Sequence, residues 1–315
     1  MRESGKIAFV FPGQGSQYVG MGKAFHAQFT VAKRVFLEAD EALGFPLSRL
    51  CFAGPESDLK LTENTQPAIL AASVAALRVL ESEGALKPDL VAGHSLGEYT
   101  ALVCAGALRF RDAVRVVRER GRLMQQAVPA DAGRMAVVLG LGMEAVCSVC
   151  EGASNGEVVA PANYNGAGQI VIAGAKGAVA RAMLLAKERG AKRVLELPVS
   201  APFHCPLMRP AAEGLRTILE DIAIQPFSVG VVTNVEAEVN LDPNRVKPLL
   251  IEQAVRPVRW EESVQKLESL GCARMWEIGP GKVLKGLIQR ISSGVAADNF
   301  EAPQDLAKLS GGHPG

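Results

Sequence analysis

One short stretch limits the fold of this chain more than any other. An apolar segment, Leu90–Gly93, leads into Gly-His-Ser-Leu-Gly at residues 93–97, and small residues typical of a helix follow. Gly-x-Ser-x-Gly alone is weak evidence in a chain with many glycines. A strand, a tight glycine turn and a helix around it are the context in which this motif presents a nucleophilic serine. The stretch therefore predicts an α/β fold with Ser95 at the end of a strand.

Length and charge narrow the class of protein. The chain has 315 residues, enough for one large α/β domain with an insertion or for two smaller domains. Its formal net charge is +1, so no global field attracts it to nucleic acid or to an acidic membrane surface. The apolar runs are much shorter than the ~20 residues that a membrane span needs. We expect neither nucleic acid nor membrane as a partner.

The cysteines and the first residues indicate the compartment. Six scattered cysteines suit reduced thiols, and Cys147-x-x-Cys150 has no second pair or nearby histidine for a zinc site. The chain begins with a charged segment that leads directly into the strand-like run 7–11, which does not resemble a signal peptide. We expect a cytoplasmic protein, or the mature form of an organellar one, that uses no metal and no cofactor.

The apolar patterns divide the chain into two units. Residues 1–131 and 199–296 predict a large α/β domain, α/β-hydrolase-like, with a mostly parallel sheet. Residues 132–198 read strand, helix, strand, strand, helix, strand, the order of a ferredoxin-like α+β unit. The small unit is inserted in the large one, and the crevice between them is a natural ligand site. Residues 297–315 have no apolar periodicity, so we expect a flexible tail.

A serine hydroxyl needs a base to take its proton, and the chain has four histidines. His26 lies in an amphipathic helix, His94 is inside the glycine turn, and His313 is in the tail. His204 follows a strand and stands between two prolines that fix the local backbone. It is the favoured base for Ser95, the alternative being an ordinary loop histidine.

No carboxylate stands out as a third member of a triad. Glu196 lies on an apparently buried strand and Glu213 on an exposed helix, so a backbone carbonyl is an alternative acceptor for His204. A pair of serine and histidine can suffice for thioesters, because a thiolate leaves with less protonation than an amine. Oxyanion donors would come from the amide of Leu96 and from the glycine-rich turn at Gln14.

An arginine-rich helix offers a site for an anionic group. It carries Arg115, Arg118, Arg120 and Arg122 around Gly121. Most such arginines are solvated surface residues, but a guanidinium can also clamp a carboxylate through two hydrogen bonds.

Four separated motifs agree on one family. They are Phe-Pro-Gly-Gln-Gly-Ser-Gln at 11–17, Gly-His-Ser-Leu-Gly-Glu at 93–98, Pro-Val-Ser-Ala-Pro-Phe-His at 198–204 and Glu-Ile-Gly-Pro-Gly at 277–281. In their order and context they resemble the malonyl-CoA:acyl carrier protein transacylases of fatty acid synthesis. The resemblance runs from about residue 6 to 292 and includes the inserted unit.

The resemblance implies a ping-pong reaction. Ser95 would take the malonyl group from malonyl-CoA and pass it to the phosphopantetheine thiol of holo acyl carrier protein, with His204 as the base. It also implies oxyanion donation by the amides of Gln14 and Leu96. Gln253 matches the family glutamine whose backbone carbonyl orients the histidine, which fits the missing aspartate.

The resemblance further implies the substrate contacts. Arg120 would pair with the malonyl carboxylate and so disfavour acetyl and plain acyl groups, which would leave a buried guanidinium unpaired. Phe203 stands where many relatives carry serine, and its bulk should crowd an α-methyl branch. Asn163, in the strand-like run 158–165, is a further substrate-binding candidate.

A basic face provides a candidate docking surface for the acidic carrier. It consists of Lys176, Arg181, Lys187 and Arg189, and the alternative is a solubilising helix face. The family likeness favours a monomer. The sequence leaves open whether the acceptor serves fatty acid or polyketide synthesis.

Two other classes remain as alternatives. A serine esterase of the α/β-hydrolase type shares the glycine turn, but it expects an acid between the serine and a late histidine. A silent binding subunit of a larger synthase would have no reason to keep both Ser95 and His204.

Overall fold

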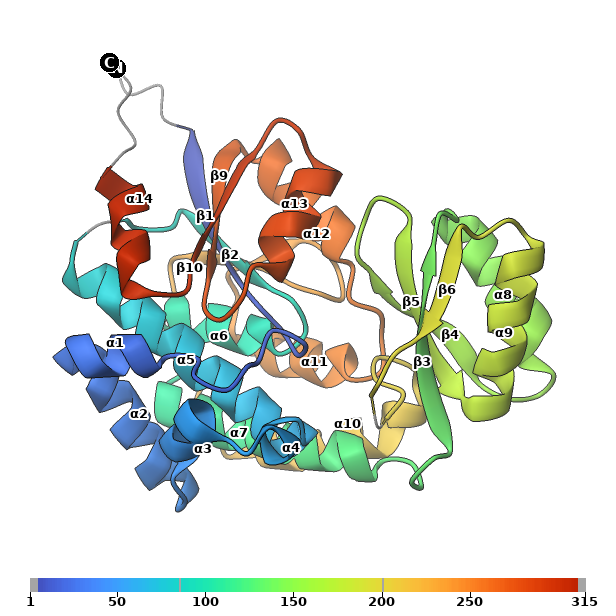
Figure 1. Cartoon of the computed structure of the whole chain (residues 1–315), viewed down its shortest axis with the longest axis horizontal. Helices are drawn as coiled ribbons and strands as arrows, with labels where there is room; N and C mark the ends of the chain where they lie inside the picture. Colours follow the sequence, from blue (N-terminus) through green and yellow to red (C-terminus); the bar gives the residue numbers. More distant parts are fainter. Residues whose placement is uncertain (1–4, 85, 200, 311–315) are drawn as a thin grey trace.

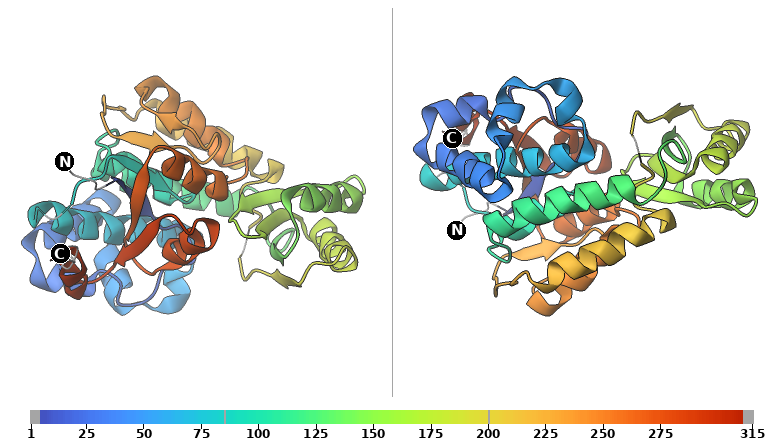
Figure 2. Two further views of the ribbon diagram at one scale, coloured as in Figure 1. Left: turned by 90° about the horizontal axis from the view of Figure 1, so that it is seen from above. Right: turned by 90° about the horizontal axis from the view of Figure 1, so that it is seen from below.

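The computed structural model describes residues 5–84, 86–199 and 201–310, arranged in two lobes of unequal size (Figure 1). The small lobe comprises residues 133–196, residues 197–199 belong to the segment that leads out of it, and the large lobe comprises the other described residues. The α/β character that the sequence predicts is confirmed. Each lobe has its own sheet, and the small lobe projects at one end of the long axis (Figure 2).

The large lobe is built on a six-stranded sheet. Its order is β10 (Ala296–Phe300), β9 (Cys272–Ile278), β1 (Lys6–Phe11), β2 (Leu90–Gly93), β7 (Gly230–Val232) and β8 (Val239–Asn240). Every pair is parallel except β7 with β8. Since parallel strands end at one edge, the segments that follow β1, β2 and β7 meet there.

Helices cover both faces of this sheet. One face packs against α1 (Lys23–Gln28), α2 (Thr30–Leu43), α3 (Leu47–Ala53), α4 (Glu56–Leu59), α5 (Thr62–Ser82), α6 (Gly97–Cys104), α7 (Phe110–Gln126), α10 (Arg209–Glu220) and α11 (Pro243–Gln253). The other face packs against α12 (Trp260–Ser269) and α13 (Val283–Ile291). Neighbouring β1 residues alternate between the two cores, Phe9 on one side and Val10 on the other, as a strand buried on both faces requires.

The longest helix, α5, is buried on nearly all sides, and its length of 21 residues reflects the depth of the core. Among the described residues, no helix combines the length and apolar character of a membrane span.

The small lobe contains a four-stranded antiparallel sheet in the order β4 (Val159–Tyr164), β5 (Gln169–Ala175), β3 (Gly133–Leu139) and β6 (Arg193–Glu196). Its two helices, α8 (Met143–Ser154) and α9 (Lys176–Glu188), cover one face of that sheet. The opposite face carries Met135 and Val171, which pack toward Met124 and Phe203 of the large lobe. This second face therefore forms one wall of the junction between the lobes.

A short backbone pairing joins the two lobes. The Tyr164 amide donates to the Val258 carbonyl over 2.9 Å, and the Val258 amide donates to the Ala162 carbonyl over 2.9 Å. Because Val258 lies five residues after Gln253, this bridge fixes the small lobe close to the carboxyl edge of the large sheet.

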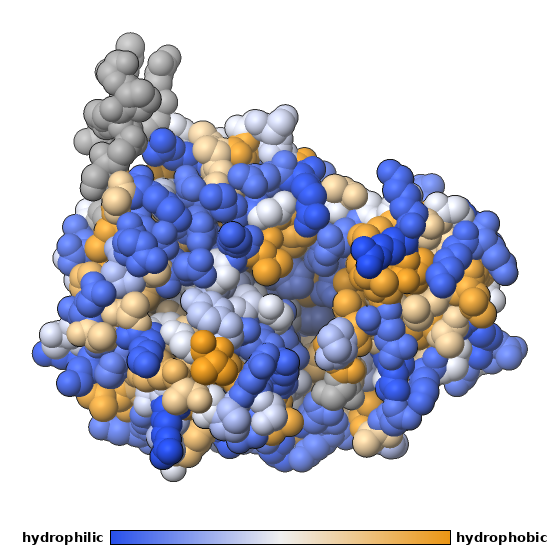
Figure 3. Space-filling model, viewed as in Figure 1, coloured by the Kyte–Doolittle hydropathy of each residue, from blue (hydrophilic) through white to orange (hydrophobic). Residues whose placement is uncertain are grey.

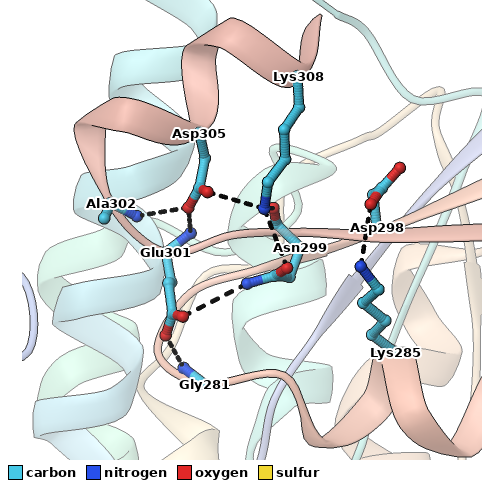
Figure 4. A network of polar contacts seen from close by, with 8 residues as sticks. All are labelled: Gly281, Lys285, Asp298, Asn299, Glu301, Ala302, Asp305 and Lys308. Carbon is cyan, nitrogen blue, oxygen red and sulfur yellow. Dashed lines mark hydrogen bonds and ion pairs between the residues drawn. The ribbon is translucent and has the colours of Figure 1, made fainter.

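The expectation of a flexible tail from residue 297 is wrong for residues 297–310. Strand β10 pairs with β9 along five residues, and Phe300 is fully buried. Polar contacts secure the segment (Figure 4): Glu301 accepts from the Gly281 amide over 2.8 Å, and Lys308 pairs with Asp305. The sequence signal was hidden because the adjacent polar residues Asp298 and Asn299 interrupt the apolar pattern of this edge strand. The last five residues lie outside the described part.

Candidate active site

Ser95 occupies the sharp turn between β2 and α6. Its backbone has a positive φ of 53°, a conformation that a non-glycine residue adopts only when its surroundings impose it. A Cβ atom on Gly93 would lie 1.9 Å from the carbonyl carbon of Gly97, and one on Gly97 would lie 2.0 Å from the Phe11 oxygen. Both glycines of the motif are therefore required by close backbone packing.

Ser95, His204 and Gln253 form one hydrogen-bonded chain. The Ser95 Oγ lies 2.6 Å from His204 Nε2, and His204 Nδ1 lies 2.7 Å from the backbone oxygen of Gln253. A carbonyl can only accept, so Nδ1 carries the proton and Nε2 presents a lone pair to the serine. This is the tautomer that a general base needs.

The surroundings of His204 keep its imidazole neutral. Burial, followed by the nearby Arg120 guanidinium, lowers the pKa of His204 to about 3, while its hydrogen bond to Gln253 opposes that shift. His204 also has a positive φ of 58°, which is imposed by the loop between its flanking prolines. No carboxylate contacts the ring among the described residues. Glu196, which the sequence placed on a buried strand, is in fact exposed and pairs with Arg134.

Arg120 reaches the serine from α7. Its side chain is 2% exposed and donates to Gln66 Oε1 over 2.7 Å, to Gln253 Oε1 over 2.9 Å and to Ser95 Oγ over 3.2 Å. No carboxylate forms an ion pair with it in the described ranges. A buried guanidinium held by neutral amides beside a hydroxyl group is suited to an anionic ligand.

Three residues that the sequence analysis did not select complete this arrangement. Asn234 follows β7 and accepts from the Ser95 amide over 2.7 Å, while its Nδ2 donates to the Gly93 oxygen over 2.6 Å. Gln66 lies on the apolar helix α5, and Glu98 lies one turn after Ser95. A polar residue directly after a parallel strand was a usable signal for Asn234. For Gln66 and Glu98 only a polar side chain in an apolar helix could have drawn attention.

The predicted oxyanion donors lie on neighbouring loops. Phe11 and Gly93 are partners in the parallel register, so the turn after β1 and the turn after β2 meet at the same edge. Within the described ranges, neither the Gln14 amide nor the Leu96 amide donates to a protein acceptor. Gln14 and Leu96 both line the same cavity as Ser95. Two uncommitted amides beside a nucleophile can bind a developing oxyanion.

The serine opens into a cavity between the lobes. It contains about 570 Å³ of empty space, part of it open to solvent, and Figure 3 shows the hollow from outside. The large lobe contributes its polar groups and Phe203, while the small lobe contributes Met135 and Asn163, and Leu197 and Val199 come from the segment that joins the lobes. The structure thus brings every predicted site residue to one place.

A second cavity continues from the first. It shares Gln14, His94, Asn163 and Leu197 with the first cavity and extends to Val283 and other apolar residues of α13. The serine is therefore approached along a groove with apolar walls.

The basic face is less free than the sequence suggested. Lys176 pairs with Asp131, and Arg181 pairs with Glu157 and donates to two backbone carbonyls at the end of α8. Arg189 donates to the hydroxyl of Ser148. Lys187 has no such contact within the described residues.

A model of a known protein family matches this chain. The acyl transferase domain matches residues 8–300, nearly the whole described chain. This chain belongs to the acyl transferase family. Since that match spans both lobes, the esterase alternative from the sequence analysis is set aside.

Curated relatives narrow the group within this acyl transferase family. The malonyl CoA-acyl carrier protein transacylase of Haemophilus influenzae is 50% identical over 287 residues, which cover 91% of this chain and 92% of that protein. The enzyme of the same name from Bacillus subtilis strain 168 is 51% identical over 288 residues, or 91% and 90% of the two chains.

Solved structures agree with this acyl transferase in both lobes. An acyl carrier protein S-malonyltransferase from Vibrio cholerae has a TM-score of 0.95 and 48% identity, covering 96% of this chain and 99% of that one. A malonyl-transacylase in complex with a type II PKS acyl-carrier protein has a TM-score of 0.94 and 45% identity, covering 96% and 98%. The chain is an acyltransferase of the group that these names describe.

Proposed function

We propose that this acyltransferase moves a malonyl group from malonyl-CoA to the phosphopantetheine thiol of acyl carrier protein by a ping-pong mechanism. The observation that carries the proposal is the buried Arg120 guanidinium, 3.2 Å from Ser95 Oγ and without a carboxylate partner among the described residues. An acyl group with a free carboxylate satisfies that cation. Acetyl and longer plain acyl groups leave it unpaired.

In the first half-reaction His204 Nε2 takes the Ser95 proton while Oγ attacks the thioester carbonyl. The Gln14 and Leu96 amides stabilise the oxyanion of the tetrahedral intermediate. The carbon–sulfur bond then breaks, coenzyme A leaves as a thiolate and takes the proton from the imidazolium, and malonyl-Ser95 remains. Gln253 holds the ring through its backbone oxygen in both protonation states.

In the second half-reaction the carrier thiol enters along the same groove. His204 takes the thiol proton, and the sulfur attacks the malonyl ester. Collapse of the second intermediate breaks the ester bond, and Ser95 Oγ regains its proton from the imidazolium. The apolar cavity walls favour thiol over water as the acceptor.

Intact-protein mass spectrometry tests the proposal directly. After brief mixing with malonyl-CoA, the wild type is expected to gain one malonyl group, and Ser95→Ala none. Acetyl-CoA should give little adduct. Exposed Ser57 on α4 offers a matched control, since Ser57→Ala should label like the wild type. A folded wild type without any malonyl adduct contradicts the proposal.

Phe203 is our candidate for rejecting an α-methyl branch. Its ring lines the cavity beside Ser95 and is almost completely buried, which leaves little room for an added methyl group. Phe203→Ser should raise kcat/KM for methylmalonyl-CoA relative to malonyl-CoA. Equal values for the two thioesters in the wild type would remove this role.

The carrier-docking role of the basic face of α9 also stays a proposal. Lys187 supports it best, because the other three residues of this face are occupied by contacts with Asp131, Glu157 and Ser148. Lys187→Glu combined with Arg189→Glu is expected to raise KM for the carrier and to spare malonyl-CoA. An unchanged carrier KM would reject this surface.

We also propose the finer descriptions for which the sequence argued: an α/β-hydrolase-like large lobe, a ferredoxin-like small lobe, and a cytoplasmic monomer. The strand order β4-β5-β3-β6 with two helices on one face supports the ferredoxin-like description. Sedimentation of the purified protein tests the monomer.

A further inference from the structure

Glu98 is a buried carboxyl group that the proposed mechanism does not use. It lies in the first turn of α6, three residues after Ser95, and is 2% exposed. Its Oε2 accepts from Gln253 Nε2 over 2.7 Å and from the Asn234 amide over 3.1 Å. Both partners contact the serine or the histidine, so Glu98 lies directly behind the reacting pair.

The contacts of Gln253 show what Glu98 does for its side chain. Gln253 Oε1 accepts from the cationic Arg120, and therefore its Nε2 must face acceptors. Glu98 Oε2 at 2.7 Å is the shortest of these contacts, ahead of the Ser95 oxygen at 3.0 Å. A reversed amide would direct N–H groups at the guanidinium. Glu98 thereby fixes the orientation of the residue whose backbone oxygen holds His204.

The charge of Glu98 matters as well as its shape. In the transition state His204 becomes an imidazolium while Arg120 remains a cation beside it, and the ring rests on a neutral carbonyl where a triad has a carboxylate. The groups that act electrostatically on Glu98 are Arg120 from α7 and the neutral Tyr99 phenol on its own helix. Its other side borders a small cavity lined by Thr233, Asn240 and aliphatic side chains.

We propose that Glu98 is a positioning residue for the His204 base, acting through Gln253, and that its negative charge offsets the two cations of the transition state. The inference rests on the roles of Ser95 and His204 in the proposed function, but not on the identity of the acyl group. It deepens that function by assigning the missing acid of the triad to a residue that does not contact the histidine.

The test uses a small sulfonyl fluoride, which modifies an activated serine without malonyl-CoA or a carboxylate. Burial raises the pKa of Glu98 to about 7, so its charge is present above that pH and is lost below it. His204, with its pKa lowered to about 3, stays neutral throughout this range. The rate constant for Ser95 modification in the wild type is expected to fall roughly tenfold between about pH 8 and pH 5.5.

Two variants separate charge from shape. Glu98→Gln keeps the acceptor oxygen but not the charge, and it should react slowly at every pH, within about twofold of the wild type at low pH. Glu98→Asp keeps the charge and should retain the pH step. Thermal unfolding checks that each variant is folded, and if Glu98→Gln is not, the wild-type and Glu98→Asp profiles decide.

Wild-type reactivity that does not change with pH, or a Glu98→Gln profile that coincides with that of the wild type, would overturn the inference. Malonyl labelling of the same samples separates this failure from that of the proposed function. Loss of malonyl labelling with a normal sulfonyl fluoride profile rejects the malonyl assignment and leaves the role of Glu98 standing.

Discussion

The two lobes bury very different groups. In the large lobe the buried interior contains Glu98, Arg120, His204 and Glu277, all capable of carrying charge. In the small lobe the buried polar residues, among those described, are two asparagines, Asn163 and Asn165, both of which line a cavity toward the large lobe. The small lobe is otherwise held by an aliphatic core between its sheet and its two helices.

This difference indicates that the large lobe holds the reacting groups and that the small lobe encloses the cavity. Reacting groups need fixed positions and a low local dielectric, which the large lobe provides through hydrogen bonds across four of its elements. The small lobe supplies one wall of the cavity, and this wall acts mainly through its shape. Changes in the large lobe should therefore affect rate constants, and changes in the small lobe should mainly affect KM.

The largest effect is expected at the base. His204→Ala should lower the rate constant of malonyl transfer roughly 10⁴-fold, because a serine without a base is a poor nucleophile. Quenched time-point assays of malonyl transfer to the carrier measure this rate constant. His26→Ala on α1 is the control, and it should leave transfer near the wild-type rate. A loss of less than tenfold in His204→Ala would mean that another group takes the proton.

The next effect concerns Arg120. Arg120→Ala removes the guanidinium that we propose binds the malonyl carboxylate, so kcat/KM for malonyl-CoA should fall roughly 1000-fold while acetyl-CoA changes little. Arg122→Ala on the same helix is the matched control, since its side chain is only half-buried and pairs with Glu119. Equal losses for both thioesters would show that Arg120 does not select the substrate.

A third prediction tests the difference in buried charge between the two lobes through the pH dependence of unfolding. Burial raises the pKa of Glu277 from its usual 4.5 to about 7. Between these values the folded state holds a proton that the unfolded chain releases, so this group's contribution to stability decreases as pH rises. Between about pH 5 and pH 8, the free energy of unfolding of Glu277→Gln should rise relative to that of the wild type by roughly 3 kcal/mol at most.

Denaturant unfolding at both pH values measures this difference. The Glu277 Oε2 oxygen accepts the Lys285 amide at the start of α13, a bond that a glutamine oxygen can keep. Small-lobe variants provide the contrast, because that lobe has no buried carboxyl group among its described residues. A constant difference between wild type and variant across the pH range would contradict the expectation.

The smallest effect is expected at the cavity wall, where the segment 197–199 leaves the small lobe. Leu197→Ala should raise KM for malonyl-CoA about three- to tenfold with little change in kcat, since it removes apolar surface from both cavities. Leu184→Ala is the matched control, because that leucine lies on α9 and is 62% exposed. A large drop in kcat for Leu197→Ala would mean that the wall also positions the reacting groups.

Sequence patterns predicted much of this site, for reasons that differ by residue. Ser95 and His204 could be predicted from the sequence because backbone geometry restricts their neighbours to glycine and proline. The role of the Gln253 backbone followed from the family resemblance. Its side-chain contacts did not, because the partners of a buried amide depend on helices 100 or more residues apart in the chain, such as α6 and α11. The ordered β10 was missed because Asp298 and Asn299 mask its strand pattern.

The positions of β1 and α14 have a consequence for access to the serine. The start of β1 and the helix α14 lie on the side of the large lobe away from the small lobe (Figure 1). Because Lys308 and Asp305 secure α14 there, neither end crosses the groove that leads to the serine. The entrance to the two cavities is therefore left open by both of these elements.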